Sequence, residues 1–249
     1  MESFVELGDW FADPAHWSGA NGIPTRIVEH LGISAVPVLL AVAVALPLGI
    51  LIGHYRRGEV IVVSIANLGR AIPSFAILSI VFQVMASLVQ AAAFGFWPTV
   101  VALFLLAVPP VITNTYVGIR EVDQPTVEAA RGMGMSERQV MVRLELPLAV
   151  PLMVAGIRTA AVQVVATATL AALIAGGGLG RYIVDGFAQG DTPKILAGAI
   201  LVAILAVATE AVFAVLERLV TPRTSSRADG PPVSLGSPPP TVPETVTAA

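Results

Sequence analysis

Long apolar stretches constrain the fold of this chain more than any other feature of its sequence. A helix of about 20 apolar residues is long enough to cross the hydrocarbon core of a bilayer. Inside a bilayer every backbone N–H and C=O group has to be hydrogen-bonded within the protein, which restricts crossing segments to helices and closed barrels. The composition, with 55% hydrophobic and 12% charged residues, is typical of a polytopic helical protein. The expected spans are 33–53, 60–93, 99–117, 148–174 and 195–216.

These stretches predict an all-α, multi-pass protein of the plasma or inner membrane with about five transmembrane helices. Arg56 and Arg57 directly follow the first span, and positive charge is enriched at cytoplasmic ends. Further arginines lie in or beside the next inner loop, at Arg120, Arg131, Arg138 and Arg143. We therefore expect the N-terminus outside, the C-terminus inside and loop 118–147 in the cytoplasm. The expected domains are an extracytoplasmic segment 1–30, a membrane domain 31–220 and a disordered Pro/Ser/Thr-rich tail 221–249.

The segment 60–93 is too long for one straight crossing. Arg70, Pro73 and Ser74 interrupt it, so it forms either two spans or one long broken helix. We favour the broken helix, because the interruption is too short and too apolar for a comfortable hairpin. Arg70 would be costly in the bilayer unless it faces protein or water. Two interpretations of Arg70 stay open: a place on a translocation path or subunit contact, and a snorkelling side chain that neutralises helix-end carbonyls.

Polar residues inside the other spans are candidates for a path through the membrane. Asn114 follows Pro109–Pro110, where its amide either satisfies carbonyls freed by a kink or lines a pore. Gln163 and Thr167 lie four residues apart and share a helix face. Small residues beside them also permit close helix packing, which by itself explains much of this stripe. The candidate path residues are Arg70, Ser74, Asn114, Gln163 and Thr167.

Three further segments complete the expectations for the chain. His16 and His30 are isolated in the sequence, and we expect them at the surface or at headgroup level rather than as ligands. The glycine-rich segment 176–180 is expected to form a flexible re-entrant turn over the pore, and 181–194 a polar outer loop. Glu210 is expected to form an ion pair with Arg218 or with a neighbouring subunit.

The sequence argues against several other classes of function. It contains no cysteine, so thiol catalysis and disulfides are excluded. It contains no P-loop and no HExxH motif, and no catalytic or metal-binding residues are expected. An ion-coupled secondary transporter would need acids at mid-depth, and Glu210 is the only candidate. A membrane-embedded enzyme would need paired carboxylates or a nucleophile arrangement, and the spans offer neither.

The charged segment 128–147 has strong local signals for a helix, a corner and a second helix. Pro125 suits the first turn of a helix, and Gly132 and Gly134 break that helix. Ser136 and Gln139 have capping-box spacing, so a second helix is expected from residue 137. Val140 and Leu144 share one face of it, and Pro147 ends it or bends it. Such a shape suits insertion into a groove on a soluble partner.

The same segment resembles the EAA loop of ABC importer permeases. The matching residues are Glu128, Ala129, Ala130, Gly134, Leu144, Leu146 and Pro147, with Leu144 where the family usually has Ile. The strings GRAIPSFA (69–76), TATLAALIAGGGLG (167–180) and NTYVGIREVD (114–123) are similar to the osmoprotectant branch of these permeases. Residues 30–53 strengthen that placement, and the resemblance covers roughly residues 25–218.

The resemblance implies the type I importer core shared with methionine importers, working by alternating access. It implies partners: a dimer of ATP-binding subunits that hold ATP and Mg, a second permease subunit, identical or paralogous, and an extracytoplasmic binding protein. This chain is then no enzyme and binds no cofactor. The implied solutes are glycine betaine, choline, carnitine or proline, with methionine as the alternative. Since only 6% of the residues are aromatic, we expect the binding protein to set specificity.

Overall fold

The computed structural model describes residues 2–89 and 94–220, and within these residues the chain forms helices and no strands. The expected all-α fold class is therefore confirmed. The elements are α1 (Glu2–Ala12), η1 (Pro14–Trp17), α2 (Ile23–Tyr55), α3 (Glu59–Ala71), α4 (Ser74–Leu88), α5 (Phe96–Arg120), α6 (Gln124–Gly132), α7 (Glu137–Val140), η3 (Met141–Glu145, a π-helical turn), α8 (Leu146–Thr167), η4 (Ala168–Ile174), α9 (Gly180–Gln189) and α10 (Thr192–Val220).

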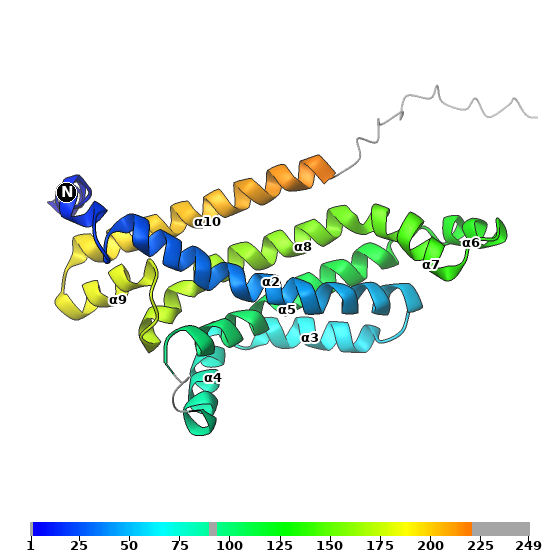
Figure 1. The fold of residues 1–249 in the computed structure, drawn as a ribbon, viewed down its shortest axis with the longest axis horizontal. Helices are drawn as coiled ribbons and strands as arrows, with labels where there is room; N and C mark the ends of the chain where they lie inside the picture. The colour runs from blue at the N-terminus through cyan, green and yellow to red at the C-terminus, as the bar shows by residue number, and fades with distance from the viewer. Residues whose placement is uncertain (1, 90–93, 221–249) are drawn as a thin grey trace, which may run out of the picture.

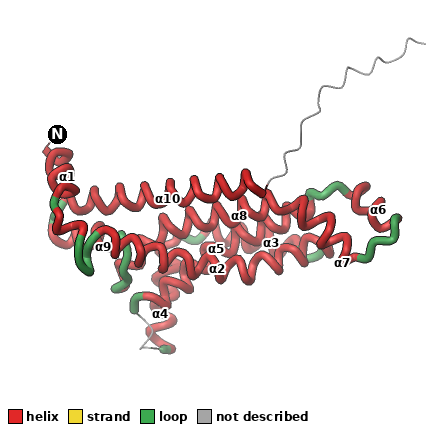
Figure 2. Tube along the Cα trace, turned by 45° about the horizontal axis from the view of Figure 1, so that its top comes forward, coloured by secondary structure: helices red, strands yellow, loops and turns green. Residues whose placement is uncertain are grey.

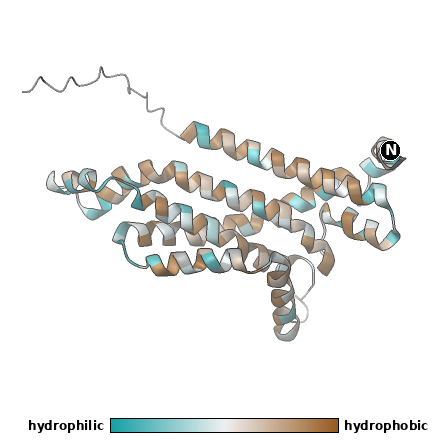
Figure 3. Ribbon diagram, turned by 180° about the vertical axis from the view of Figure 1, so that it is seen from behind, coloured by the Kyte–Doolittle hydropathy of each residue, from teal (hydrophilic) through white to brown (hydrophobic). Residues whose placement is uncertain are grey.

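The long helices lie side by side and define one long axis of the molecule (Figures 1 and 2). α2 packs on α5, α5 packs on α8, and α8 packs on α10. α6 and α7 form one end of this bundle, and α1 and α9 lie at the other end. The hydropathy colouring shows apolar residues along the bundle and polar residues gathered at the α6–α7 end (Figure 3). This distribution is what a protein embedded across a bilayer requires.

Four helical stretches are long and apolar enough to cross a membrane: Ile23–Tyr55, Phe96–Arg120, Glu137–Ile174 and Thr192–Val220. In the expected span 60–93, Ile72 and Pro73 separate α3 from the shorter apolar helix α4, and α4 projects sideways from the bundle (Figure 1). The chain is thus interrupted beside the proline that the sequence analysis singled out. Residues 90–93 lie outside the described residues. The assignment of α3 and α4 to one crossing, and the total of about five, stay predictions.

Two boundary expectations at the α1–α9 end are wrong. α2 begins at Ile23, well ahead of residue 33, because Gly22 and Pro24 start a helix there. Most of 181–194 is helix α9 rather than a polar loop. Its buried Tyr182 donates a hydrogen bond of 2.7 Å to the carbonyl of Asn21, and burial raises the pKa of this phenol. A helix forms because Tyr182 and Gly186, four residues apart, both pack inward.

The crossing of α2 and α5 is built on small residues. Ala41, Ala45, Gly49 and Gly53 recur every fourth residue of α2, and all four are buried. A Cβ atom on Gly49 would lie 2.8 Å from Cβ of Thr115. A Cβ atom on Gly53 would lie 2.7 Å from Cβ of Ile119. Close approach through small residues is the usual source of helix association in membranes, where burial of apolar surface provides little driving force.

We predict that Gly53→Ala destabilises the protein by about 1–3 kcal/mol, because the added methyl group overpacks the α2–α5 crossing. Gly32→Ala on the same helix is the matched control, since a Cβ there meets no atom within 4 Å. It should be neutral or stabilise by up to about 1 kcal/mol through helix propensity. Thermal unfolding of both purified variants in detergent measures the difference. Equal midpoints would contradict the assigned role of this crossing.

Candidate functional site

Helix α6 presents two different faces. Its N-terminus is capped by Asp123, whose carboxylate accepts hydrogen bonds from the backbone N–H (3.2 Å) and the hydroxyl (2.8 Å) of Thr126. Ala130 is buried against α7 with the other apolar residues of this small cluster, Val122, Val127 and Val140. Glu128 and Ala129 are exposed. The Glu-Ala-Ala sequence therefore contributes its third residue to packing and leaves the first two free for another protein.

The corner after α6 depends on one glycine. Gly134 has φ of +87°, in the left-handed region that side chains disfavour. Gly132 is the last helical residue, so the break expected at both glycines falls at Met133 and Gly134. The turn is closed by a hydrogen bond of 3.2 Å from the N–H of Met135 to the carbonyl of Ala130. The side chain of Met133 is 78% exposed at the tip of the corner.

The second helix of the loop begins as the sequence predicted. Ser136 and Gln139 form a capping box, with the Gln139 amide oxygen accepting from the N–H of Ser136 at 2.8 Å. Arg131 of α6 donates two hydrogen bonds of 2.9 Å to the Glu137 carboxylate. This hydrogen-bonded guanidinium lowers the pKa of Glu137, so the bridge is fully formed above the ordinary glutamate pKa and is lost as the pH falls through the lowered pKa. The bridge is exposed, and it holds α6 and α7 in one orientation.

The expectation that Pro147 ends this helix is wrong, and the alternative that it bends the helix stays a prediction. The chain remains helical from Glu137 through the π-helical turn Met141–Glu145 into α8. Pro147 is the second residue of α8 and directly follows the π-helical turn. Leu144 packs on the loop cluster, and Leu146 packs beside Ile119 and Met153. The second helix of the loop is thus continuous with α8 through the π-helical turn.

We predict that Gly134→Ala weakens association with the ATP-binding subunit that the resemblance implies, because a left-handed conformation costs an alanine roughly 1–2 kcal/mol. That cost corresponds to a loss of about tenfold in affinity. Gly132→Ala is the matched control, since Gly132 is helical and a Cβ added there, as at Gly134, would meet no atom within 4 Å. Binding of the ATP-binding subunit to each variant in nanodiscs measures the effect. Equal weakening by the two variants would rule out the corner geometry as its cause.

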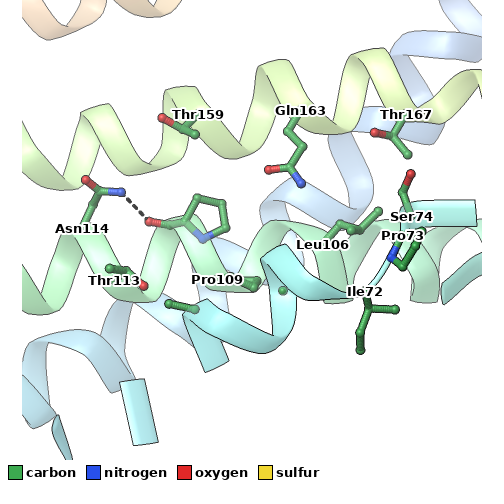
Figure 4. A pocket seen from close by; sticks show the side chains of 13 residues that line it. Ile72, Pro73, Ser74, Leu106, Pro109, Thr113, Asn114, Thr159, Gln163 and Thr167 are labelled. Carbon is green, nitrogen blue, oxygen red and sulfur yellow. Dashed lines mark hydrogen bonds between the residues drawn. The ribbon is translucent and has the colours of Figure 1, made fainter. Parts of the chain in front are cut away.

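A cavity of about 480 Å³ lies between α3, α4, α5 and α8 (Figure 4). It brings together Ser74, Asn114, Gln163 and Thr167, four of the candidate path residues. The side chain of Arg70, the fifth, lies outside the described part of the structure. The other lining residues are Ala66, Gly69, Ile72, Pro73, Leu106, Pro109, Pro110, Thr113 and Thr159.

Hydroxyl and amide groups dominate the polar part of this cavity. Thr159, Gln163 and Thr167 follow one another at intervals of four along α8 and face α5 (Figure 4). Asn114 donates a hydrogen bond of 2.8 Å to the carbonyl of Pro110. A proline in a helix frees the carbonyl four residues before it. The carbonyl of Pro110 is therefore not one of the carbonyls that Pro109 and Pro110 free. Asn114 therefore lines the cavity and bonds to its own helix at the same time.

Thr113 adds an unused hydrogen-bonding group at the cavity. Its buried Oγ1 has no partner among the described residues. Of the lining side chains that the structure describes, none is charged and none is aromatic. A polar solute can therefore exchange hydrogen bonds along this wall without meeting a fixed charge from these residues.

Glu210 does not pair with Arg218 as expected but with Arg158 of α8, at 3.4 Å. Arg158 also donates a hydrogen bond of 2.7 Å to Glu217. These bridges fasten α10 to α8. Glu210 is absent from the described cavity lining, which removes the main support for a proton-carrying acid on the path.

His30 is fully buried, so the expectation of a surface position is wrong. Its Nδ1 accepts a hydrogen bond of 3.2 Å from the N–H of Leu179, and Nε2 lies 2.9 Å from the carbonyl of Val165. Because Nδ1 accepts, Nε2 carries the proton and donates to that carbonyl. The carboxylate of the neighbouring Glu29 accepts a hydrogen bond of 2.9 Å from the N–H of Gly178. The glycine-rich turn is thus fastened to the start of α2.

Sequence reasoning missed four residues that join distant elements: Glu29, His30, His54 and Glu145. His54, at the other end of α2, contacts Glu145 of the π-helical turn at 2.5 Å. Each of these residues is a histidine or glutamate close to the end of a long apolar helix. That position is a usable signal, because a buried polar group needs a partner.

Comparison with known proteins identifies the family. A family model described as the binding-protein-dependent transport system inner membrane component matches residues 45–226. The choline transport system permease protein OpuBB of Bacillus subtilis is 39% identical over 202 residues, which are 81% of this chain and 90% of that protein. The carnitine transport permease protein OpuCB of Listeria monocytogenes is 38% identical over 195 residues, which are 78% of this chain and 86% of that protein.

A solved structure supports the same assignment at the level of the fold. An inward-facing conformation of the MetNI methionine ABC transporter is similar with a TM-score of 0.67 at 22% identity, covering 80% of this chain and 96% of that chain. The methionine-importer-like fold expected from the EAA-type loop is confirmed. The chain is a multi-pass inner-membrane protein, and it belongs to the permease family of binding-protein-dependent ABC importers.

Proposed function

We propose that this permease imports a small quaternary-amine osmoprotectant such as glycine betaine, choline or carnitine, or proline. The observation that carries the proposal is the sequence identity of 38–39% to permeases named for choline and carnitine transport. The cavity supports it. A betaine has no N–H groups, and its carboxylate accepts hydrogen bonds, which the hydroxyl and amide groups of Thr113, Gln163 and Thr167 can donate.

The proposed orientation places α6 and α7 in the cytoplasm, with the N-terminus outside and the C-terminus inside. Arg56 and Arg57 at the end of α2 and the arginines of the loop support it. Permeases of this family work with ATP-binding subunits and substrate-binding proteins. We assign the exposed residues Glu128, Ala129, Met133 and Gly134 to contact with an ATP-binding subunit, where ATP and Mg are held.

The proposed mechanism is alternating access around the cavity. Two ATP-binding subunits close on ATP, and each carries one loop with it. ATP can drive this change only if it interacts more favourably with the outward-open arrangement than with the inward-open one. Since the loop continues into α8, its displacement moves Thr159, Gln163 and Thr167 relative to α5.

Solute selection is assigned to the extracytoplasmic binding protein. Tight recognition of a quaternary ammonium group uses the faces of aromatic rings, and the described cavity lining offers none. A wall of neutral hydrogen-bonding groups suits brief occupation during transit. The complete importer contains two permease subunits, which are identical or paralogous.

We predict that labelled glycine betaine enters cells at high osmolarity when this permease is present with its ATP-binding and binding-protein partners. Glu128→Ala should reduce uptake by about tenfold, the effect of losing one charge-assisted contact of roughly 1.4 kcal/mol. Glu6→Ala, an exposed glutamate at the opposite end, is the matched control and should leave uptake unchanged. Uptake of methionine but not of betaine would overturn the proposed solute and leave the ABC mechanism standing. Normal uptake by Glu128→Ala would exclude the docking role.

We predict that Gln163→Leu slows uptake by about fivefold to tenfold, because the solute loses a hydrogen-bonding partner worth about 1 kcal/mol during transit. ATP-binding subunits should still associate normally. Gln83→Leu, an exposed glutamine on α4 outside the described cavity lining, is the matched control. Uptake rates in proteoliposomes measure the difference. If the two variants behave alike, Gln163 does not lie on the path.

A further inference from the structure

A buried polar pair joins the inner end of α2 to the start of α8. His54 Nδ1 lies 2.5 Å from Glu145 Oε2, and both side chains are only 3% exposed. The residues are separated by 91 positions in the sequence. Because N–H groups donate and carboxylates accept, the imidazole donates this bond. It is a direct polar connection between the C-terminal end of α2 and the π-helical turn that leads into α8.

The pair continues outward into the loop itself. His54 Nε2 lies 3.5 Å from Glu137 Oε2, and Glu137 accepts both hydrogen bonds from Arg131 of α6. Arg131 is one residue beyond the buried Ala130 of the Glu-Ala-Ala sequence. Arg131 and Glu137 thus link α6 to α7, and His54 and Glu145 link α2 to the π-helical turn. Between these two pairs, the His54–Glu137 contact is an ion pair only when the imidazole is protonated.

The π-helical turn explains how Glu145 reaches this position. A π turn is closed by a hydrogen bond between residues five apart, seen here from the N–H of Leu146 to the carbonyl of Met141. Residues five apart then lie on the same face of the helix, so Glu145 lies on the same face as Val140. Val140 is fully buried and Glu145 is 3% exposed. The irregular turn thus turns a glutamate inward towards α2.

A buried ionisable pair is a costly way to hold two helices together. Replacement of such a pair by apolar residues of similar size is often neutral or stabilising, whereas removal of one partner is strongly destabilising. Stability alone is therefore a weak reason for the pair to be present. A hydrogen bond between two buried groups does, however, fix direction and distance, which apolar contacts do not.

We propose that His54 and Glu145 are positioning residues that make α2 move together with the loop and α8 when the ATP-binding subunits close. This inference rests on the proposed alternating-access function. α2 packs along α5 through its small residues, and α5 carries Thr113 and Asn114 at the cavity. The pair therefore completes a second route from the docking helix to the cavity wall, beside the direct route through α8.

The decisive variant is the double substitution His54→Leu with Glu145→Met in the assembled importer. It removes both polar groups together, so no unpaired buried group remains and the protein should fold and assemble. The single variants His54→Leu and Glu145→Met each leave one unpaired group and serve for comparison. Glu6→Met, at an exposed glutamate of the N-terminal segment, is the control for the change of residue type.

Two measurements distinguish failure of this inference from failure of the proposed solute assignment. The first is labelled glycine betaine transported per ATP hydrolysed in proteoliposomes. The second is independent of the solute: the chain has no cysteine, so Thr159→Cys gives one maleimide-reactive site in the cavity wall. The rate of its labelling by a membrane-impermeant maleimide is measured with and without ATP.

We expect the double apolar variant to bind the ATP-binding subunits and to hydrolyse ATP. The amount of solute that it transports per ATP hydrolysed should fall by about fivefold or more. Fivefold is the lower end of the change in affinity that typical coupling between two sites produces. The ATP-dependent change in labelling should be lost, while the matched control behaves like the parent protein. A double variant that keeps this change and normal transport would overturn the inference, as would one that no longer binds the ATP-binding subunits. An ATP-dependent change in the parent protein without betaine uptake would overturn only the proposed solute.

Discussion

The close crossing of α2 and α5 is the interaction on which the rest of the structure depends. A bilayer offers little driving force for two apolar helices to associate, so their packing has to be close to be stable. Ala41, Ala45, Gly49 and Gly53 allow this approach, and the side chains of Thr115 and Ile119 fill the space left by the two glycines. The crossing aligns α5 so that Thr113 and Asn114 face the polar stripe of α8. It also brings the C-terminal end of α2 beside the loop.

The EAA-type segment has one face that packs against the protein and one face that is exposed. Ala130, Leu144 and Leu146 pack inward and fix its shape, whereas Glu128, Ala129 and Gly134 stay exposed. In the proposed mechanism, docking and transmission use one continuous helical element, because the second helix of the segment continues into α8. The polar contacts through Glu137 and His54 connect the same element to α2. In the proposed mechanism, a soluble partner that binds the exposed face acts on two helices. These are α8, which lines the cavity, and α2, which packs on the cavity-lining helix α5.

Local signals in the sequence predicted local structure well. They did not predict contacts between residues that are far apart in the sequence. The capping box at Ser136, the corner at Gly134 and the break beside Pro73 each arise from residues a few positions apart, so spacing reveals them. The gathering of Gln163 and Thr167 with Ser74 and Asn114 was expected only in part, because periodicity identifies a polar face but not the helix opposite. His30 and Leu179 are separated by 149 positions, and nothing local indicates that they meet. Pro147 does not end the helix, because the chain passes through a π-helical turn directly before it and stays helical.

Cross-linking from the corner of the loop tests the central claim most directly, namely that this end of the bundle is where the ATP-binding subunit acts. A photo-reactive label at Met133→Cys, in a chain that otherwise has no cysteine, should form an adduct with the ATP-binding subunit in membranes. The same label at Val28→Cys, an exposed position near the opposite end of α2, should form none with it. An adduct from Val28→Cys, or none from Met133→Cys in an importer that transports solute, would contradict the account.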